Sequence, residues 1–359
     1  MNDPGKSRVY VGTYAGEKEE SIFLYFLNTD TGELQKEKGF IAGKKPSYLV
    51  LNEQQNFLYA VNEKKASGSV CSFSLDKKSG HLEFLNRISS LGGEPVLVTM
   101  SKNGKVLIVA NYQTGNVAVF PIMEDGKLAE ATYERQHKGS GPHKDRQQSA
   151  HAHYTFFSPD HRFTFVVDLG LDKILSYILD EENGVLTAAQ QPVAFSADPG
   201  SGPRQLSFHP NGRYAYLIHE LKSTITALSY DKVNGTFLKI QTIGTIPENF
   251  NEKNKCGGIR VSPDGRFVYG SNRGHNSIAA YKINQDNGKL SYLENVSSGG
   301  DWPREFAVDP KGKWLLVANQ RSNNIISFKI DQETGRLGDT GYQVEDIKPV
   351  FLQVVTAIE

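Results

Sequence analysis

The sequence predicts an all-β protein, a seven-bladed β-propeller with four antiparallel strands in each blade. A four-strand pattern recurs about every 50 residues, and helical periodicity is nearly absent. A third observation is that the two ends of the chain supply complementary parts of one repeat.

Seven short apolar segments that end on polar residues are the predicted second strands of the repeats. They lie at residues 8–14, 57–63, 106–112, 163–169, 214–220, 267–273 and 314–320. Their starts are 49, 49, 57, 51, 53 and 47 residues apart, spacings that are typical of propeller blades.

The other strands of each repeat follow from turn signals. First strands are expected to begin near Pro46, Pro95, His151, Pro203, Gly257 and Pro303. Segments such as Ser262-Pro-Asp-Gly predict tight hairpins between first and second strands, because Pro sets φ and Gly accepts positive φ. A third strand ending in a glycine turn and a less regular fourth strand complete each repeat.

The chain ends predict how the ring closes. The chain opens on a second strand at Arg8 with no first strand before it, and residues 349–355 resemble a first strand with no second strand after it. Pairing these two segments completes the N-terminal blade and leaves no open edge. We therefore expect one domain over residues 1–359.

Composition narrows the class of protein. Lys plus Arg and Asp plus Glu number 40 each, so no overall field favours nucleic acid or an anionic membrane. Cys71 and Cys256 are too far apart in sequence to suggest a metal motif and are expected to be small buried residues. The polar start and the absence of a long apolar run predict a cytoplasmic protein. Separately, we expect a monomer or weak homo-oligomer.

Strand polarity predicts where the chemistry lies. In an antiparallel blade, the end of the second strand lies beside the start of the first strand, so both contribute to one rim of the channel. Second-strand ends supply Asn111, Asp168, Glu220, Asn272 and Arg273. First-strand starts add His151, His153, Arg204 and Arg304.

Structural roles for these residues stay open. Asn commonly caps turns, Asp168 could hold a loop instead of a ligand, and the charged residues could form a salt-bridge network. His151 and His153 could suggest a metal, but no third ligand is marked by spacing, so we expect no metal. Nucleotide-binding, zinc-protease and serine-hydrolase motifs are absent from the sequence, and no cofactor is expected.

At these rim residues the chain resembles the propeller-type lactonases, which include bacterial 6-phosphogluconolactonases of the cycloisomerase-2 type and fungal carboxymuconate cyclases. The resemblance covers nearly the whole chain and is strongest at residues 151–174, 202–221, 261–279 and 303–320. It implies a site built from His153, Arg204, Glu220 and Arg273, with His151 as a neighbour. Two departures from the family pattern are Gln205, in place of a His, and Gly258, in place of an acidic residue.

The resemblance implies hydrolysis of a phosphorylated sugar lactone, 6-phosphogluconolactone, in the pentose phosphate pathway. Glu220 or His153 would act as base, and Arg273 or Arg204 would stabilise the oxyanion. The other Arg, with Arg304, would hold the phosphate, and Asp168, Asn111 and Asn272 would contact the substrate. Arg273→Ala is then expected to lower kcat about a hundredfold with little change in melting temperature. The alternatives are another lactone, or a non-catalytic propeller that serves as a scaffold.

Overall fold

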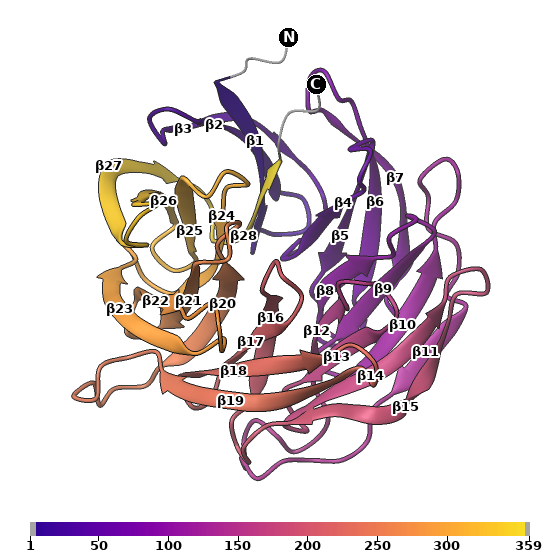
Figure 1. Cartoon of the computed structure of the whole chain (residues 1–359). Coiled ribbons are helices and arrows are strands. Elements are labelled where there is room, and N and C mark those ends of the chain that lie inside the picture. The colour runs from indigo at the N-terminus through magenta and orange to yellow at the C-terminus, as the bar shows by residue number, and fades with distance from the viewer. Residues whose placement is uncertain (1–4, 356–359) are drawn as a thin grey trace. The chain divides into compact units, whose positions relative to one another are not determined.

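The computed structural model describes residues 5–355 as strands and connecting turns (Figure 1). The strands form seven four-stranded antiparallel sheets. The first four sheets in chain order are β28 (Pro349–Val355), β1 (Lys6–Thr13), β2 (Ile22–Asn28), β3 (Leu34–Phe40); β4 (Leu49–Leu51), β5 (Phe57–Asn62), β6 (Ser69–Leu75), β7 (Leu82–Ser89); β8 (Pro95–Met100), β9 (Val106–Asn111), β10 (Asn116–Pro121), β11 (Tyr133–Gln136); and β12 (Ala152–Phe157), β13 (Thr164–Asp168), β14 (Lys173–Asp180), β15 (Val185–Ser196).

The remaining three sheets repeat the same order of strands. They are β16 (Pro203–Phe208), β17 (Tyr214–His219), β18 (Thr224–Asp231), β19 (Thr236–Gly244); β20 (Lys255–Val261), β21 (Phe267–Arg273), β22 (Ser277–Ile283), β23 (Leu290–Ser297); and β24 (Pro303–Val308), β25 (Trp314–Asn319), β26 (Asn324–Ile330), β27 (Leu337–Glu345). All seven predicted second strands are present, with ends within two residues of those expected.

The predicted closure of the N-terminal sheet is confirmed. β28 pairs with β1 in antiparallel register from Arg8↔Val355 to Thr13↔Pro349. The Tyr14 backbone N–H extends this pairing by donating to the Lys348 carbonyl at 3.0 Å. A segment from the C-terminus therefore supplies the first strand that the N-terminus lacks.

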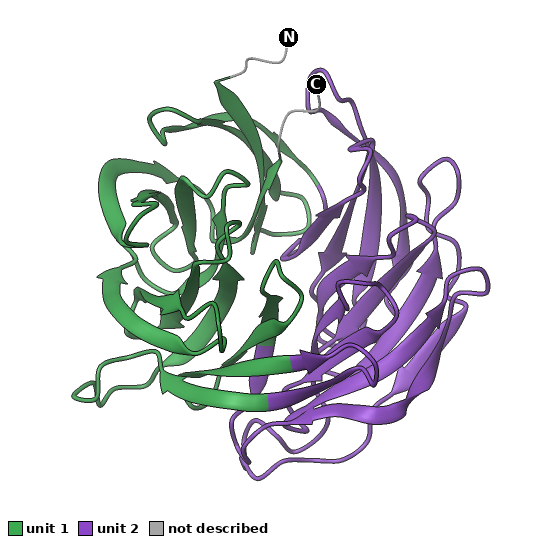
Figure 2. Ribbon diagram, in the orientation of Figure 1, with its two compact units in different colours: residues 1–41, 205–229, 239–359 green, residues 42–204, 230–238 purple. Residues whose placement is uncertain are grey.

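The contacts divide the chain into two compact units (Figure 2). Unit 1 comprises Met1–Ile41, Gln205–Ser229 and Lys239–Glu359, and unit 2 comprises Ala42–Arg204 and Tyr230–Leu238. The expectation of one domain over the whole chain stays a prediction. Cys71 and Cys256 are buried and unbridged, as the sequence predicts.

Neighbouring sheets are joined by a contact that recurs along the chain. An aromatic residue at or just before the start of a second strand packs against the turn glycine between the third and fourth strands of the next sheet. The pairs are Phe57–Gly126, Phe163–Gly235, Tyr214–Gly288, Phe267–Gly335 and Trp314–Gly32. In three of these pairs of sheets, a buried tyrosine two residues further along donates to the same glycine's carbonyl: Tyr59 to Gly126 at 3.0 Å, Tyr216 to Gly288 at 3.1 Å and Tyr269 to Gly335 at 2.9 Å.

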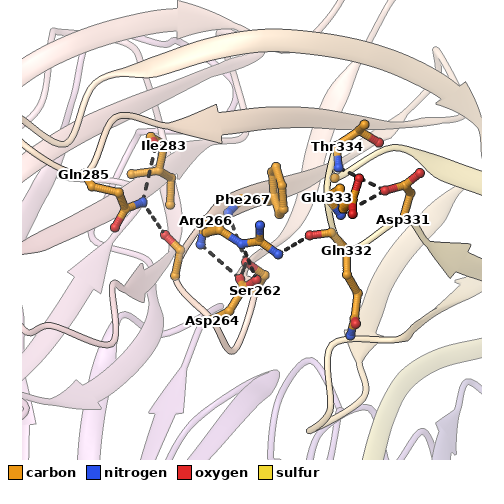
Figure 3. A network of polar contacts seen from close by, with 12 residues as sticks. Ser262, Asp264, Arg266, Phe267, Ile283, Gln285, Asp331, Gln332, Glu333 and Thr334 are labelled. Carbon is orange, nitrogen blue, oxygen red and sulfur yellow. Dashed lines mark hydrogen bonds and ion pairs between the residues drawn. The ribbon is translucent and has the colours of Figure 1, made fainter.

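Figure 3 shows one such junction, at the turn between β20 and β21. Ser262 Oγ donates to Asp264 Oδ1 at 2.6 Å and accepts the Phe267 N–H at 3.0 Å, which closes the predicted Ser-Pro-Asp-Gly turn. The Arg266 guanidinium then donates to the Gln332 carbonyl in the next sheet. The turn sequence thus shapes the hairpin and also holds the neighbouring sheet.

Two glycines with the same backbone conformation allow this contact to be measured. Gly335 has φ 75° and Gly341 has φ 74°. A Cβ on Gly335 would overlap the Phe267 ring, whereas a Cβ on Gly341 would meet nothing within 4 Å. We expect Gly341→Ala to lower the free energy of unfolding by about 1 kcal/mol, the cost of the backbone conformation alone.

Gly335→Ala should cost about 1–3 kcal/mol more than Gly341→Ala, because the ring must also move. Urea unfolding of both variants and the parent measures this difference. Equal losses in the two variants would show that ring-on-glycine packing contributes little to stability.

Candidate active site

In unit 2, the Tyr112 ring contacts both candidate histidines, His151 and His153. His151 stacks on the Tyr112 ring at 4.6 Å between centroids, and its Nδ1 lies 2.8 Å from the Tyr112 carbonyl oxygen. His153 meets the same ring edge-on at 5.6 Å. Arg146 Nη2 donates to the Tyr112 hydroxyl at 2.9 Å. The long segment before β12 therefore contacts this group through Arg146.

His153, which contacts the Tyr112 ring, lies in a β-bulge of β12. Ala152 pairs with Asp168 and Tyr154 with Val167, so His153 is an extra residue in β12. β24 has the same bulge, because Pro303 pairs with Asn319 and Glu305 with Ala318, which leaves Arg304 as the extra residue. Bulges redirect side chains at sheet ends. Arg204 follows Pro203 at the start of β16 as Arg304 follows Pro303, and its side chain is buried.

Asp168, at the end of β13, is fully buried and holds several groups at once. Its Oδ1 accepts the backbone N–H groups of His151 at 2.8 Å and Leu171 at 3.1 Å. Its Oδ2 lies 2.8 Å from His137 Nδ1. These bonds support the loop-holding role that the sequence left open for Asp168, and through them Asp168 positions the backbone of a candidate site histidine.

In unit 1, Glu220 and Arg273 form a buried ion pair. Arg273 Nη2 lies 2.8 Å from Glu220 Oε2, and the two side chains are each 5% exposed. The same nitrogen donates to the Cys256 carbonyl at 2.6 Å. Breaking such a pair leaves a buried charge without its counterion. The expectation that Arg273→Ala barely changes the melting temperature is therefore revised: we expect the variant to unfold more easily.

Two aromatic residues that contact Arg273 and Arg304, namely Trp302 and Tyr14, are not among the site residues expected from the sequence. The Arg273 guanidinium lies 5.7 Å from the Trp302 ring centroid, and Arg321 covers the same ring at 3.5 Å. Arg304 lies over the Tyr14 ring at 5.0 Å. Stacking on aromatic faces fixes the plane of a guanidinium. A pattern of polar strand ends does not reveal Trp302, because it lies in the loop before β24.

The two departures from the family pattern are explained by a third residue, Glu305. Gln205 Nε2 donates to Glu305 Oε2 at 2.7 Å, and Arg260 Nη2 lies 3.2 Å from Glu305 Oε1. A Cβ on Gly258 would overlap the Glu305 carboxylate. Gly258 therefore leaves room for Glu305, so β24 supplies the acidic group that is missing at position 258.

The asparagines at strand ends make structural hydrogen bonds. Asn111 Nδ2 donates to the Ser90 carbonyl at 2.9 Å, and Asn272 Nδ2 donates to the Thr245 carbonyl at 2.8 Å. Asn62 and Asn319 bind the Ala42 and Ser298 carbonyls in the same way, both at 2.9 Å. The amide groups hold the preceding loops, and contact of Asn111 or Asn272 with substrate stays a prediction.

Between residues 5 and 355, no group of three or more His, Cys, Asp or Glu side chains could hold a metal ion. The same stretch of chain contains no helix long and apolar enough to cross a membrane.

The fit between Gly258 and Glu305 can be tested by a double-mutant cycle. We expect Gly258→Ala to lower the free energy of unfolding by about 1–3 kcal/mol, because the new methyl displaces the carboxylate. In a Glu305→Ala background the same substitution should cost at least about 0.5 kcal/mol less. Gly244→Ala is the control, since its Cβ would make only an ordinary contact at 3.8 Å. Equal costs of Gly258→Ala in both backgrounds would contradict the assignment.

Three comparisons place the chain among known proteins. The family model "Lactonase, 7-bladed beta-propeller" matches residues 8–354. The 6-phosphogluconolactonase of Bacillus subtilis (strain 168) is 40% identical over 300 residues, 84% of each chain. A solved structure from Bacteroides fragilis NCTC 9343 superposes with a TM-score of 0.93 at 35% identity over 99% of both chains.

The periplasmic gluconolactonase of Pseudomonas aeruginosa superposes with a TM-score of 0.92 at 33% identity, covering 98% of this chain and 100% of that one. The predicted fold class is thereby confirmed. The chain belongs to the seven-bladed β-propeller lactonase family.

Proposed function

We propose that this protein hydrolyses 6-phosphogluconolactone to 6-phosphogluconate, a step of the pentose phosphate pathway. The observation that carries the proposal is the buried Glu220–Arg273 pair, which holds the Arg273 guanidinium, a donor able to stabilise the oxyanion of ester hydrolysis. The names of the Bacillus subtilis and Pseudomonas aeruginosa relatives support a sugar lactone as substrate. His153, Arg204 and Arg273 are proposed to act on one substrate molecule, and Glu220 is proposed to hold Arg273 in place.

The reaction adds water to the lactone carbonyl carbon. A base removes a proton from the water as the new C–O bond forms, and negative charge develops on the carbonyl oxygen. Collapse of this tetrahedral intermediate breaks the bond to the ring oxygen, which receives a proton and becomes a hydroxyl. The released acid loses its proton to solvent at neutral pH.

We assign the roles of Arg273 and Glu220 from their hydrogen bonds, and the remaining roles follow from these two. Arg273 stabilises the oxyanion, because its guanidinium is held by Glu220 and the Cys256 carbonyl. Glu220 acts as a positioning residue, since its Oε2 already accepts from Arg273. His153 is then the base. Arg204 and Arg304 are assigned to the phosphate, which arginine binds through two parallel hydrogen bonds.

The location and assembly state belong to the same proposal. A phosphorylated substrate is charged and stays on the side of the membrane where it is made, so we propose the cytoplasm. Because the Pseudomonas aeruginosa relative is named as periplasmic, cell fractionation is the measurement that distinguishes the cytoplasm from the periplasm. We propose no nucleic-acid or membrane partner and a monomer or weak homo-oligomer, which light scattering measures.

The main test is the rate of opening of freshly prepared 6-phosphogluconolactone, read as proton release above the spontaneous background. We expect the parent protein to accelerate it with and without a chelator, and Arg273→Ala to lower kcat at least about a hundredfold. The variant should also lose about 3–5 kcal/mol of stability, because Glu220 is left buried without its partner.

A paired control separates the chemistry from the folding effect. Replacing both members of the pair, Arg273→Met with Glu220→Gln, removes the unbalanced charge and should recover much of the stability but none of the rate. A parent rate equal to background would exclude the proposed substrate. A double variant with parental kcat would remove Arg273 from the mechanism.

The choice of base is tested by pH dependence. With His153 as base, His153→Gln should abolish the acidic limb of the profile of kcat/KM against pH, because that limb reports protonation of the base. Glu220→Gln should lower kcat but keep the limb, since it disturbs only the position of Arg273. A limb that disappears in Glu220→Gln and persists in His153→Gln would assign the base to Glu220.

A further inference from the structure

Unit 2 contains a pocket of about 590 Å³ outside the candidate active site. It is lined by the end of β11 and the residues after it, by β14 and by β15, which lie close to one another in Figure 1. A volume of this size fits a small organic ligand.

A large bulge in β15 lies at the pocket's edge. Leu175 pairs with Val193 and Tyr177 pairs with Ala188, so residues 189–192 of β15 lie opposite the single residue Ser176 of β14. Pro192 and Val193 line the pocket beside this bulge. The strand pair is interrupted here, which is a feature that sheets commonly use to shape sites.

The lining is cationic. Arg135, Lys138 and Lys173 all line the pocket, and Glu134 is the acidic residue among the lining residues of the described chain. The Glu134 carboxylate is engaged elsewhere, because its Oε1 accepts from Asn116 Nδ2 at 2.9 Å. Arginine and lysine together favour phosphate, which takes paired hydrogen bonds from the first and a point charge from the second.

Two buried side chains form a polar floor. Tyr177 Oη lies 3.0 Å from His137 Nε2, and their rings are stacked with an interplanar angle of 7°. Burial raises the pKa of Tyr177 to about 12, with the Arg135 guanidinium acting in the opposite direction. Tyr177 therefore keeps its proton at neutral pH and contributes a hydroxyl, not a negative charge.

The floor is connected to the candidate active site through Asp168. His137 Nδ1 binds Asp168 Oδ2, and Asp168 Oδ1 holds the backbone N–H of His151. The backbone makes a second connection between the pocket and the candidate active site. The segment that begins at Lys138, in the pocket lining, continues to Arg146, which donates to the Tyr112 hydroxyl. His151 stacks on the ring of Tyr112.

We propose that this pocket binds a small phosphorylated molecule as a second ligand, and that its occupation changes lactone turnover through the His137–Asp168–His151 connection. The binding part is independent of the proposed function, whereas the effect on turnover rests on it. A site of this kind would let the level of a phosphorylated metabolite adjust the rate.

Binding is tested by titration calorimetry with pyrophosphate as the probe, at constant ionic strength. The pocket variant carries Lys138→Gln and Lys173→Gln. The control carries Lys77→Gln and Lys102→Gln, which remove the same charge from exposed positions outside the pocket lining. We expect the pocket variant to bind at least tenfold more weakly than the parent and the control to bind like the parent. Equal affinities in the two double variants, or no saturable binding by the parent, would overturn the site.

Turnover is tested with the same proteins. Without pyrophosphate, the kcat/KM of both double variants should stay within twofold of the parent value, because neither replaces a proposed active-site residue. Saturating pyrophosphate should change the rate of the parent and the control at least twofold and leave the pocket variant unaffected. An equal change in all three proteins would place pyrophosphate in the lactone site and overturn the coupling, as would an unchanged parent rate. Calorimetry needs no lactone activity, so it still decides on the pocket if the proposed function fails.

Discussion

The contact between a second-strand aromatic ring and the turn glycine of the next sheet is the constraint on which the other features depend. It recurs in both units, with Phe57 on Gly126 in one and Phe267 on Gly335 in the other. A buried tyrosine also donates a hydrogen bond to the carbonyl of the same glycine, and this bond fixes the orientation of the turn against the neighbouring sheet. Because a single sheet cannot bury both of its faces, such junctions hold the sheets in place. The packing acts at the starts of the second strands, and Asp168, Glu220 and Arg273 lie at or just after the opposite ends of these strands.

The strand pattern was predictable because it depends on local chemistry. Alternation, Pro and Gly turns and spacing need no knowledge of distant residues, and the pairing of residues 349–355 with Arg8 followed from counting strands. The polar strand ends also identified Asp168, Arg204, Glu220 and Arg273, which the structure shows to be buried. What these residues bind was beyond the sequence, because partners such as Glu220 and Arg273 are 53 positions apart.

The bulges and the Glu305 arrangement show why the rest could not be predicted. Whether His153 is an extra residue in β12 depends on hydrogen bonds to β13 and not on residue type. Gln205 and Gly258 look like losses when each is considered alone. Together with Glu305 they form one packed group, in which Gly258 leaves the space and Gln205 donates the hydrogen bond. A single sequence shows the three residues but not that they occupy one volume.

Asp168 illustrates how structural and chemical roles combine in one side chain. It is fully buried, and its two oxygens bind groups on opposite sides: the His151 backbone on one and the His137 ring on the other. A buried carboxylate is tolerable only when its oxygens are satisfied. The same bonds that satisfy Asp168 therefore link the long segment between His137 and His151 to the end of β13. Because His137 and the His151 backbone bind the two oxygens of one carboxylate, the stability of this buried charge and the geometry of the candidate site depend on the same few atoms.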